Sequence, residues 1–168
     1  QKHFGDINGD GIQDLAMFYA GTSRAFIEYA LGSSVGLSQL QSQPTQLAQM
    51  QPLPAVYPND SQWRSILVDI NGDHVLDMAA VLQNGESGQT YMYGVYGGPQ
   101  GLIDRPFHFT WSHSAWGMGG IASLQSGDFD GDGYSDVFGG GTIPDAGLKS
   151  FRSASGKTDE LETISNGI

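Results

Sequence analysis

The segment Gly5–Gly21 reads GDINGDGIQDLAMFYAG and joins an aspartate-rich loop to an apolar run. Asp6, Asn8 and Asp10 occupy alternate positions, a glycine follows them, and Asp14 closes the loop. Oxygen-bearing side chains at alternate positions of a tightly turned backbone can point at one centre. The apolar run that follows has the length and residue types of a short β-strand. The segment therefore predicts a loop of oxygen ligands that leads directly into a strand.

The same loop occurs twice more in the chain. Residues 68–85 read VDINGDHVLDMAAVLQNG, and residues 127–141 read GDFDGDGYSDVFGGG. The first aspartates of the three loops are residues 6, 69 and 128, so successive loops lie 63 and 59 residues apart. A second landmark follows each loop: a glycine at residue 32, 97 or 156, with a leucine five positions later. Two landmarks that recur in the same order predict three repeated units.

Short apolar or alternating runs surround the loops and predict strands. The expected strands are Leu15–Tyr19, Ala25–Leu31, Ser65–Val68, Met78–Leu82, Thr90–Tyr96, Phe107–Trp111 and Ile121–Leu124, with an edge strand near Gln46–Met50. No strand is expected before the first loop, because the chain begins almost at that loop. The 25 glycines suit tight turns between strands. We therefore expect an all-β protein, a single array over residues 1–168 with units of about 60 residues at 1–60, 61–120 and 121–168.

Each loop offers five oxygen ligands, at positions 1, 3, 5, 7 and 9, of which position 7 contributes its main-chain carbonyl. The candidate metal ligands are Asp6, Asn8, Asp10, Ile12 and Asp14 in the first loop, Asp69, Asn71, Asp73, Val75 and Asp77 in the second, and Asp128, Asp130, Asp132, Tyr134 and Asp136 in the third. Hard divalent cations prefer oxygen ligands, and the chain contains no cysteine. The expected cofactor is Ca²⁺, with up to three ions.

Position 6 of such a loop takes the left-handed backbone conformation, which suits Gly11 and Gly133. The second loop has His74 there, and a side chain in that conformation costs energy. We therefore expect the second loop to bind calcium most weakly. The third loop has aspartate at all four side-chain positions and is expected to bind most tightly.

The charge of the chain is concentrated in these loops. Its formal net charge is −11, from 18 acidic residues and 7 Lys plus Arg, and ten of the acids are loop aspartates. This balance argues against nucleic acid as a partner. No stretch reaches the roughly 18 apolar residues of a membrane span. Millimolar calcium outside the cell suits weak loops of this type, so we expect an extracellular protein whose signal peptide is already removed.

Other calcium-loop families fit the sequence less well. EF-hands need flanking helices and a glutamate at position 12, where this chain has Met17, Ala80 and Gly139. The DxNxDGxxD and DxDxDGxxD loops, each followed by an apolar strand, and the YGGPQGL stretch at Tyr96–Leu102 instead resemble the FG-GAP repeats of integrin α-chain β-propellers and the related VCBS-type repeats. The resemblance covers the chain from Asp6 to about Leu161.

This resemblance implies three β-propeller blades, each with a structural calcium loop between neighbouring strands. Three blades do not close a propeller, which typically has four to eight. Two expectations therefore stay open: the chain is part of a longer propeller, or several chains assemble. If several chains assemble, we expect them to associate through the open edges of their blades.

The leading functional expectation is an extracellular, non-enzymatic adhesion or recognition module with a protein or glycan ligand. Aromatic side chains that could stack on sugars are Trp63, Trp111, Trp116, Tyr93 and Tyr96, and the alternative is that they pack the blades. A second hypothesis is a fibre or surface-layer subunit built by strand complementation between chains. A third is a non-catalytic domain of a secreted enzyme or toxin. No nucleophile elbow or metalloprotease motif indicates catalysis. Asn59 begins a glycosylation acceptor pattern, and the sequence does not indicate whether it is modified.

Overall fold

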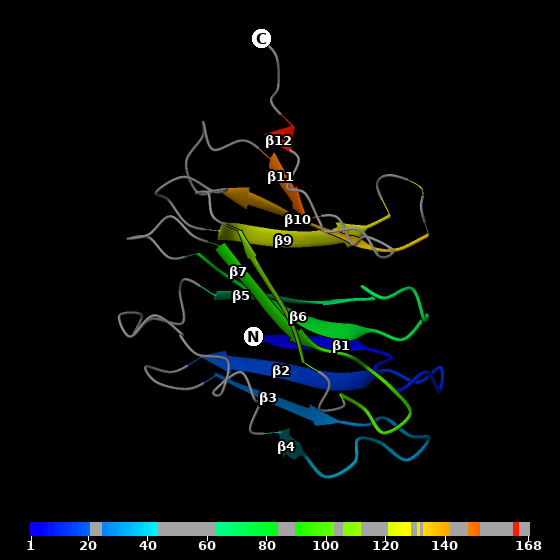
Figure 1. Ribbon diagram of the computed structural model, residues 1–168. Helices are drawn as coiled ribbons and strands as arrows, with labels where there is room; N and C mark the ends of the chain where they lie inside the picture. The colour runs from blue at the N-terminus through cyan, green and yellow to red at the C-terminus, as the bar shows by residue number, and fades with distance from the viewer. Residues whose placement is uncertain are drawn as a thin grey trace.

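The elements of the computed structural model are β-strands throughout the part of the chain that it describes (Figure 1). That part comprises residues 1–20, 25–43, 63–83, 90–102, 106–111, 121–128, 131, 133–141, 148–151 and 163–164. The strands are β1 (Lys2–Gly5), β2 (Asp14–Ala20), β3 (Ala25–Ala30), β4 (Gln41–Gln43), β5 (Trp63–Val68), β6 (Asp77–Gln83), β7 (Thr90–Val95), β8 (Pro106–Trp111), β9 (Ile121–Gly127), β10 (Asp136–Gly141), β11 (Leu148–Phe151) and β12 (Thr163–Ile164). The predicted all-β class is confirmed.

The strands form three four-stranded sheets, each built from four consecutive strands. The orders are β1-β2-β3-β4, β5-β6-β7-β8 and β9-β10-β11-β12, and every pairing is antiparallel. The sheets are stacked, with the second sheet between the first and the third (Figure 1). The first strands of the sheets are neighbours, because β5 contacts both β1 and β9. We refer to the three sheets with their loops as units 1, 2 and 3.

One expectation about the strands was wrong. A strand does precede the first loop: Lys2–Gly5 forms β1 and pairs with β2 from Lys2↔Met17 to Gly5↔Asp14. The few residues before the loop suffice because Gln1 anchors them. Its amino group donates to the Phe18 carbonyl at 2.7 Å, and its side-chain amide donates to the Trp63 carbonyl at 2.8 Å. The strand expected near Gln46–Met50 lies outside the described residues.

The apolar core lies between the sheets. Side chains of unit 1 such as Phe18 and Ile27 pack against side chains of unit 2 such as Met78 and Tyr93. Within this layer the rings of Phe18 and Trp63 lie 5.4 Å apart, and those of Trp63 and Tyr93 lie 5.9 Å apart. Trp63 and Tyr93 are buried, so they pack the core and do not offer a surface for sugar stacking. A second layer that includes Val81 and Val137 joins units 2 and 3.

Tyr96, another of the aromatic side chains considered for sugar stacking, packs partly buried against this second layer. Trp111 ends β8, and its side chain lies outside what the structure describes. Trp116 falls outside the described residues, as does Asn59. For the aromatic residues whose surroundings are described, the packing alternative therefore holds.

Backbone hydrogen bonds repeat between neighbouring units. The N–H of Leu76, at position 8 of the second loop, donates to the carbonyl of Asp6, at position 1 of the first loop (3.0 Å). The same bond recurs one unit later, from Ser135 to Asp69 (3.2 Å). The second and third loops are thereby tied to the loop of the unit before them.

Candidate metal centre

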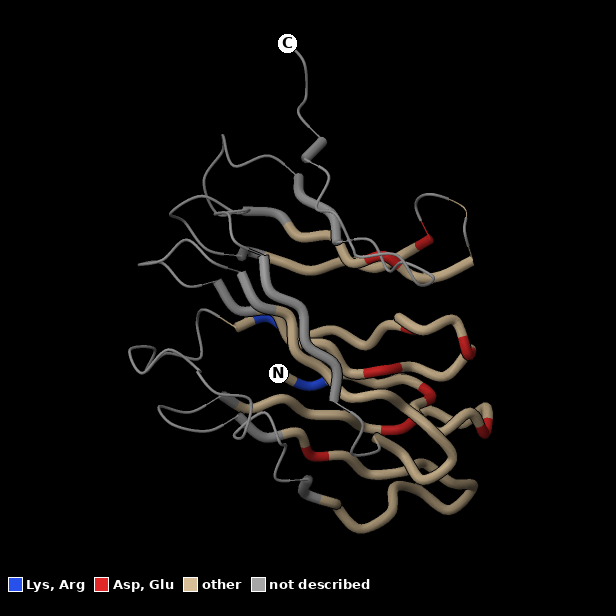
Figure 2. Tube along the Cα trace, viewed as in Figure 1, with Lys and Arg blue, Asp and Glu red and all other residues tan. Residues whose placement is uncertain are grey.

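The three aspartate loops lie along the same side of the stack of sheets (Figure 1). Each connects the first two strands of its sheet, β1 to β2, β5 to β6 and β9 to β10. Most of the described acidic residues gather on this side (Figure 2). The repeated backbone bonds between loops explain the alignment, because they fix each loop against its neighbour. The fold therefore brings the three predicted ligand loops into one row.

Asp6, at position 1 of the first loop, organises that loop around its carboxylate. Its Oδ1 accepts the N–H of Gly9 at 2.6 Å, Asp10 at 3.2 Å and Asn8 at 3.3 Å, and its Oδ2 accepts the N–H of Gly11 at 2.7 Å. Burial acts to raise the pKa of Asp6, but these four hydrogen bonds outweigh it and lower the pKa below its ordinary value. The carboxylate is therefore ionised at neutral pH.

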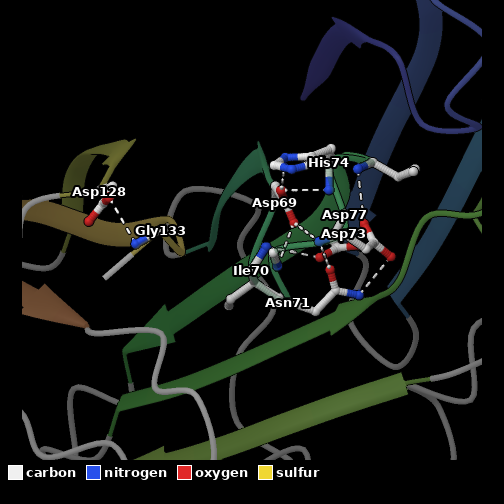
Figure 3. A network of polar contacts seen from close by, with 10 residues as sticks. Asp69, Ile70, Asn71, Asp73, His74, Asp77, Asp128 and Gly133 are labelled. Carbon is white, nitrogen blue, oxygen red and sulfur yellow. Dashed lines mark hydrogen bonds and ion pairs between the residues drawn. The ribbon is translucent and has the colours of Figure 1, made fainter. Parts of the chain in front are cut away.

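The second loop repeats this arrangement (Figure 3). The Asp69 carboxylate accepts the N–H of Gly72 at 2.8 Å, of Asp73 at 3.1 Å and of His74 at 2.9 Å. In the third loop Asp128 accepts the N–H of Gly131 at 2.7 Å and of Gly133 at 3.0 Å. The position-1 aspartate thus winds the backbone in the same way in all three loops.

Positions 3 and 5 of the first two loops also match. The Asn8 Oδ1 accepts the N–H of Asp10, and the Asp10 Oδ1 accepts the N–H of Ile12 at 2.8 Å. In the second loop Asn71 and Asp73 make the same two contacts. Asp10 and Asp73 are exposed, and the Oδ2 of each accepts the side-chain amide N–H of the position-3 asparagine, at 3.1 Å from Asn8 and 3.0 Å from Asn71. In the third loop, Asp130 and Asp132 lie outside the described residues.

The position-9 aspartates are buried: Asp14 and Asp77 are 0% exposed and Asp136 is 1% exposed. Asp14 accepts the N–H of Ile7 at 2.9 Å through Oδ2 and the N–H of Gly32 at 2.6 Å through Oδ1. A carboxylate has about four lone-pair directions, so these two bonds leave capacity for a cation. Position 9 therefore fastens the loop to the sheet in addition to its expected role as a ligand.

Asp77 makes the equivalent contacts, to the N–H of Ile70 at 3.0 Å and of Gly97 at 2.8 Å. Burial, which is the largest cause, and the nearby carboxylates of Asp73 and Asp69 together raise the pKa of Asp77 to about 7, against the opposite effect of its two hydrogen bonds. A buried carboxylate beside two others is unfavourable when all are ionised. A bound cation would relieve this cost.

The landmark glycines found in the sequence are explained by this contact. Gly32 and Gly97 each donate their N–H to the position-9 aspartate of their own unit. A Cβ on Gly32 would lie 2.3 Å from the Gln13 carbonyl oxygen, and one on Gly97 would lie 2.4 Å from the Leu76 carbonyl oxygen. Only glycine fits so close to the backbone. The spacing of the repeats identified these glycines in the sequence, but it did not predict their hydrogen bond to the position-9 aspartate. The third landmark glycine, Gly156, lies outside the described residues.

Position 6 has the expected left-handed backbone in every loop. The φ angles are +80° at Gly11, +67° at His74 and +90° at Gly133. His74 is the only non-glycine residue with positive φ among the residues that the structure describes. The second loop therefore keeps the geometry of the other two and carries backbone strain to do so.

Replacing His74 with glycine is expected to raise the free energy of unfolding by about 0.5–1 kcal/mol, because it removes this strain. The exposed His74–Asp69 ion pair, at 3.8 Å, contributes little and its loss should not offset the gain. Urea unfolding in EDTA measures the effect. His74→Ala is the control, since it removes the imidazole and keeps the strain; equal stability of the two variants would show that strain is not the cause.

The donor set of each loop suits a hard cation, since it consists of carboxylate, amide and carbonyl oxygens. Among the residues that the structure describes, however, no group of three or more His, Cys, Asp or Glu side chains is placed to hold a metal ion. The hydrogen bonds account for this arrangement, because the position-1 and position-9 carboxylates face backbone N–H groups. The oxygen-bearing residues of the loops fit calcium by their chemistry. Ligation would require exposed carboxylates such as those of Asp10 and Asp73 to turn toward the centre of their loops.

Searches with protein-family models, curated proteins and solved structures found no match to this chain. In the described part of the chain there is no helix with the length and apolar character needed to span a membrane.

Proposed function

We propose that the protein is a calcium-stabilised, non-catalytic recognition or adhesion module that works outside the cell. Its units correspond to propeller blades of the FG-GAP or VCBS type, and calcium is structural. The observation that carries the proposal is the repeated loop, in which Asp6, Asp69 and Asp128 each wind the backbone around a carboxylate. Repetition of one oxygen-rich turn along one side of three stacked sheets is expected of a shared cation chemistry.

The electrostatics of the loops support this proposal. The chain carries a net charge of −11, and ten of its acidic residues are loop aspartates. In the second loop, burial and two neighbouring carboxylates raise the pKa of Asp77 to about 7. Bound calcium would supply positive charge where this repulsion is greatest and would join the loop to the sheet. The residues that would hold it are those at positions 1, 3, 5, 7 and 9.

A calcium titration of EDTA-treated protein tests the proposal. We expect up to three ions per chain by calorimetry and a rise in melting temperature. A site saturated at 100 times its dissociation constant adds about 2.7 kcal/mol to stability. Magnesium at the same concentration should have a smaller effect, because it prefers a compact octahedral shell. The absence of any calcium response would overturn the proposal.

A matched pair of variants separates specific ligation from general charge. Asp10→Asn combined with Asp73→Asn keeps an oxygen that can accept the N–H at position 7, and removes two ligand charges. We expect calcium affinity at these two loops to fall at least about tenfold. Glu28→Gln removes an acidic charge from β3, outside the loops, and should leave affinity unchanged. Equal effects of the two changes would contradict specific ligation.

A further inference from the structure

The exposed large apolar side chains, among the side chains whose burial the structure describes, all belong to unit 1. They are Phe4, Ile12, Tyr19, Val35, Leu37 and Leu40. Exposed apolar side chains concentrated on one unit of a repeated fold indicate a surface that another element covers when the equivalent positions of the next unit are buried. Within this chain, the equivalent surface of unit 2 is covered by unit 1, and the contacts between these two units show how.

The leucine at the second landmark shows the contrast most clearly. Leu102 of unit 2 packs against unit 1 and is 1% exposed, whereas Leu37, the equivalent residue of unit 1, is 51% exposed. The preceding turn of unit 2 is also bound to unit 1, since the N–H of Gly98 donates to the Ile7 carbonyl at 3.0 Å. The face of unit 1 that corresponds to this contact is open.

The strand before the loop gives the same result. Phe4 of β1 is equivalent to Leu67 of β5, because Phe4 pairs with Leu15 next to the loop as Leu67 pairs with Met78. Leu67 packs against the core between units 1 and 2, but Phe4 is 64% exposed. Two apolar positions that are covered in unit 2 are thus uncovered in unit 1.

The loops add a contact that occurs twice in the chain. The position-7 side chain of one unit lies over the position-4 glycine of the unit before it. A Cβ on Gly9 would be 3.1 Å from Val75 Cγ2, and one on Gly72 would be 2.5 Å from Tyr134 Cε1. The third position-7 side chain, Ile12, is 40% exposed. Ile12 therefore presents a large side chain at the loop position from which Val75 and Tyr134 contact the preceding unit.

Unit 3 presents the complementary feature. Gly131 is its position-4 glycine, and a Cβ placed there would have nothing within 4 Å in the part of the chain that the structure describes. The two ends of the stack thus offer the two halves of one contact: an uncovered position-7 side chain on unit 1 and an uncovered position-4 glycine on unit 3.

We propose that the open face of unit 1 binds unit 3 of a second copy of this chain, head to tail. Ile12 of one copy then covers Gly131 of the other, and Leu37 becomes buried as Leu102 is within the chain. The contact joins sheet faces, unlike strand pairing at sheet edges. A head-to-tail contact of this kind builds a ring if its rotation closes and a filament if it does not. The proposal does not depend on calcium binding.

The mass of the purified chain in solution, measured by light scattering over a range of concentrations with calcium and with EDTA, tests the proposal. Wild-type mass should rise with concentration in at least one of the two conditions. Leu37→Asp should weaken association at least roughly tenfold, since it places a charge in the contact. Val35→Asp is the matched control: its equivalent Gln100 stays exposed beside unit 1, so this change should have less than a twofold effect.

A mixing experiment tests the pairing of the two ends. Gly131→Asn fills the space over Gly131 with a residue that tolerates positive φ. Each variant, Leu37→Asp or Gly131→Asn, retains one intact end and should remain monomeric alone. Mixed in equal amounts, they should form a heterodimer that grows no further. A monomer at every wild-type concentration, equal effects of Leu37→Asp and Val35→Asp, or no heterodimer on mixing would each overturn the proposal.

Discussion

Replacing Gly97 with alanine is expected to lower the free energy of unfolding by at least roughly 3 kcal/mol. The added Cβ would lie 2.4 Å from the Leu76 carbonyl oxygen and 2.8 Å from the Ile7 carbonyl oxygen. Both neighbours are backbone atoms, so relief of the contact with Leu76 would distort the second loop, and relief of the contact with Ile7 would move unit 2 away from unit 1. The shift would also weaken the bond from the Gly97 N–H to Asp77.

Urea unfolding of Gly97→Ala beside Gly36→Ala measures this effect. Gly36 has a φ of +123°, but a Cβ there would meet nothing within 4 Å. Alanine at Gly36 therefore reports the cost of a left-handed backbone without a steric contact, about 1–3 kcal/mol, whereas Gly97 has no positive φ and its loss reports the steric contact. A loss at Gly97 smaller than about 1 kcal/mol would contradict the steric explanation.

The periodic features of the sequence were sufficient to predict the fold class and most strands. The apolar runs at Leu15–Tyr19 and Met78–Leu82 fall within β2 and β6, because alternation and loop position define these strands locally. β1 was missed because its stability comes from distant partners. Gln1 contacts Phe18 and Trp63, and His3 contacts Ser65 at 2.8 Å through its ring nitrogen. Such contacts have no local sequence signal.

In the candidate site, too, local features could be predicted from the sequence and features that depend on tertiary contacts could not. The ligand pattern and the left-handed position 6 follow from local spacing, and His74 has the expected positive φ. The burial of Asp14 and Asp77 does not follow from spacing, because it depends on how the loop folds back against the landmark glycine. The order of calcium affinities among the loops stays a prediction.

The stability of the calcium-free protein is expected to fall as the pH rises from about 4 to about 7. Asp77 causes this dependence, because its pKa is 3.8 as an ordinary carboxyl and about 7 in the folded protein. In this window the folded state keeps a proton that the unfolded state has lost, so each rise in pH favours unfolding. The contribution is present below pH 3.8 and is lost once the pH exceeds about 7.

Urea unfolding in EDTA at several pH values measures this dependence, with Asp77→Asn as the reference, since that variant cannot titrate there. The difference in stability between wild type and Asp77→Asn should change across the window by a few kcal/mol at most. Asp73→Asn keeps Asp77 but removes a neighbouring charge that raises its pKa, so its window should end at a lower pH. With saturating calcium the wild-type dependence should disappear or reverse, because a bound cation favours the ionised carboxylate. Parallel pH profiles for wild type and Asp77→Asn in EDTA would show that Asp77 is not the group responsible.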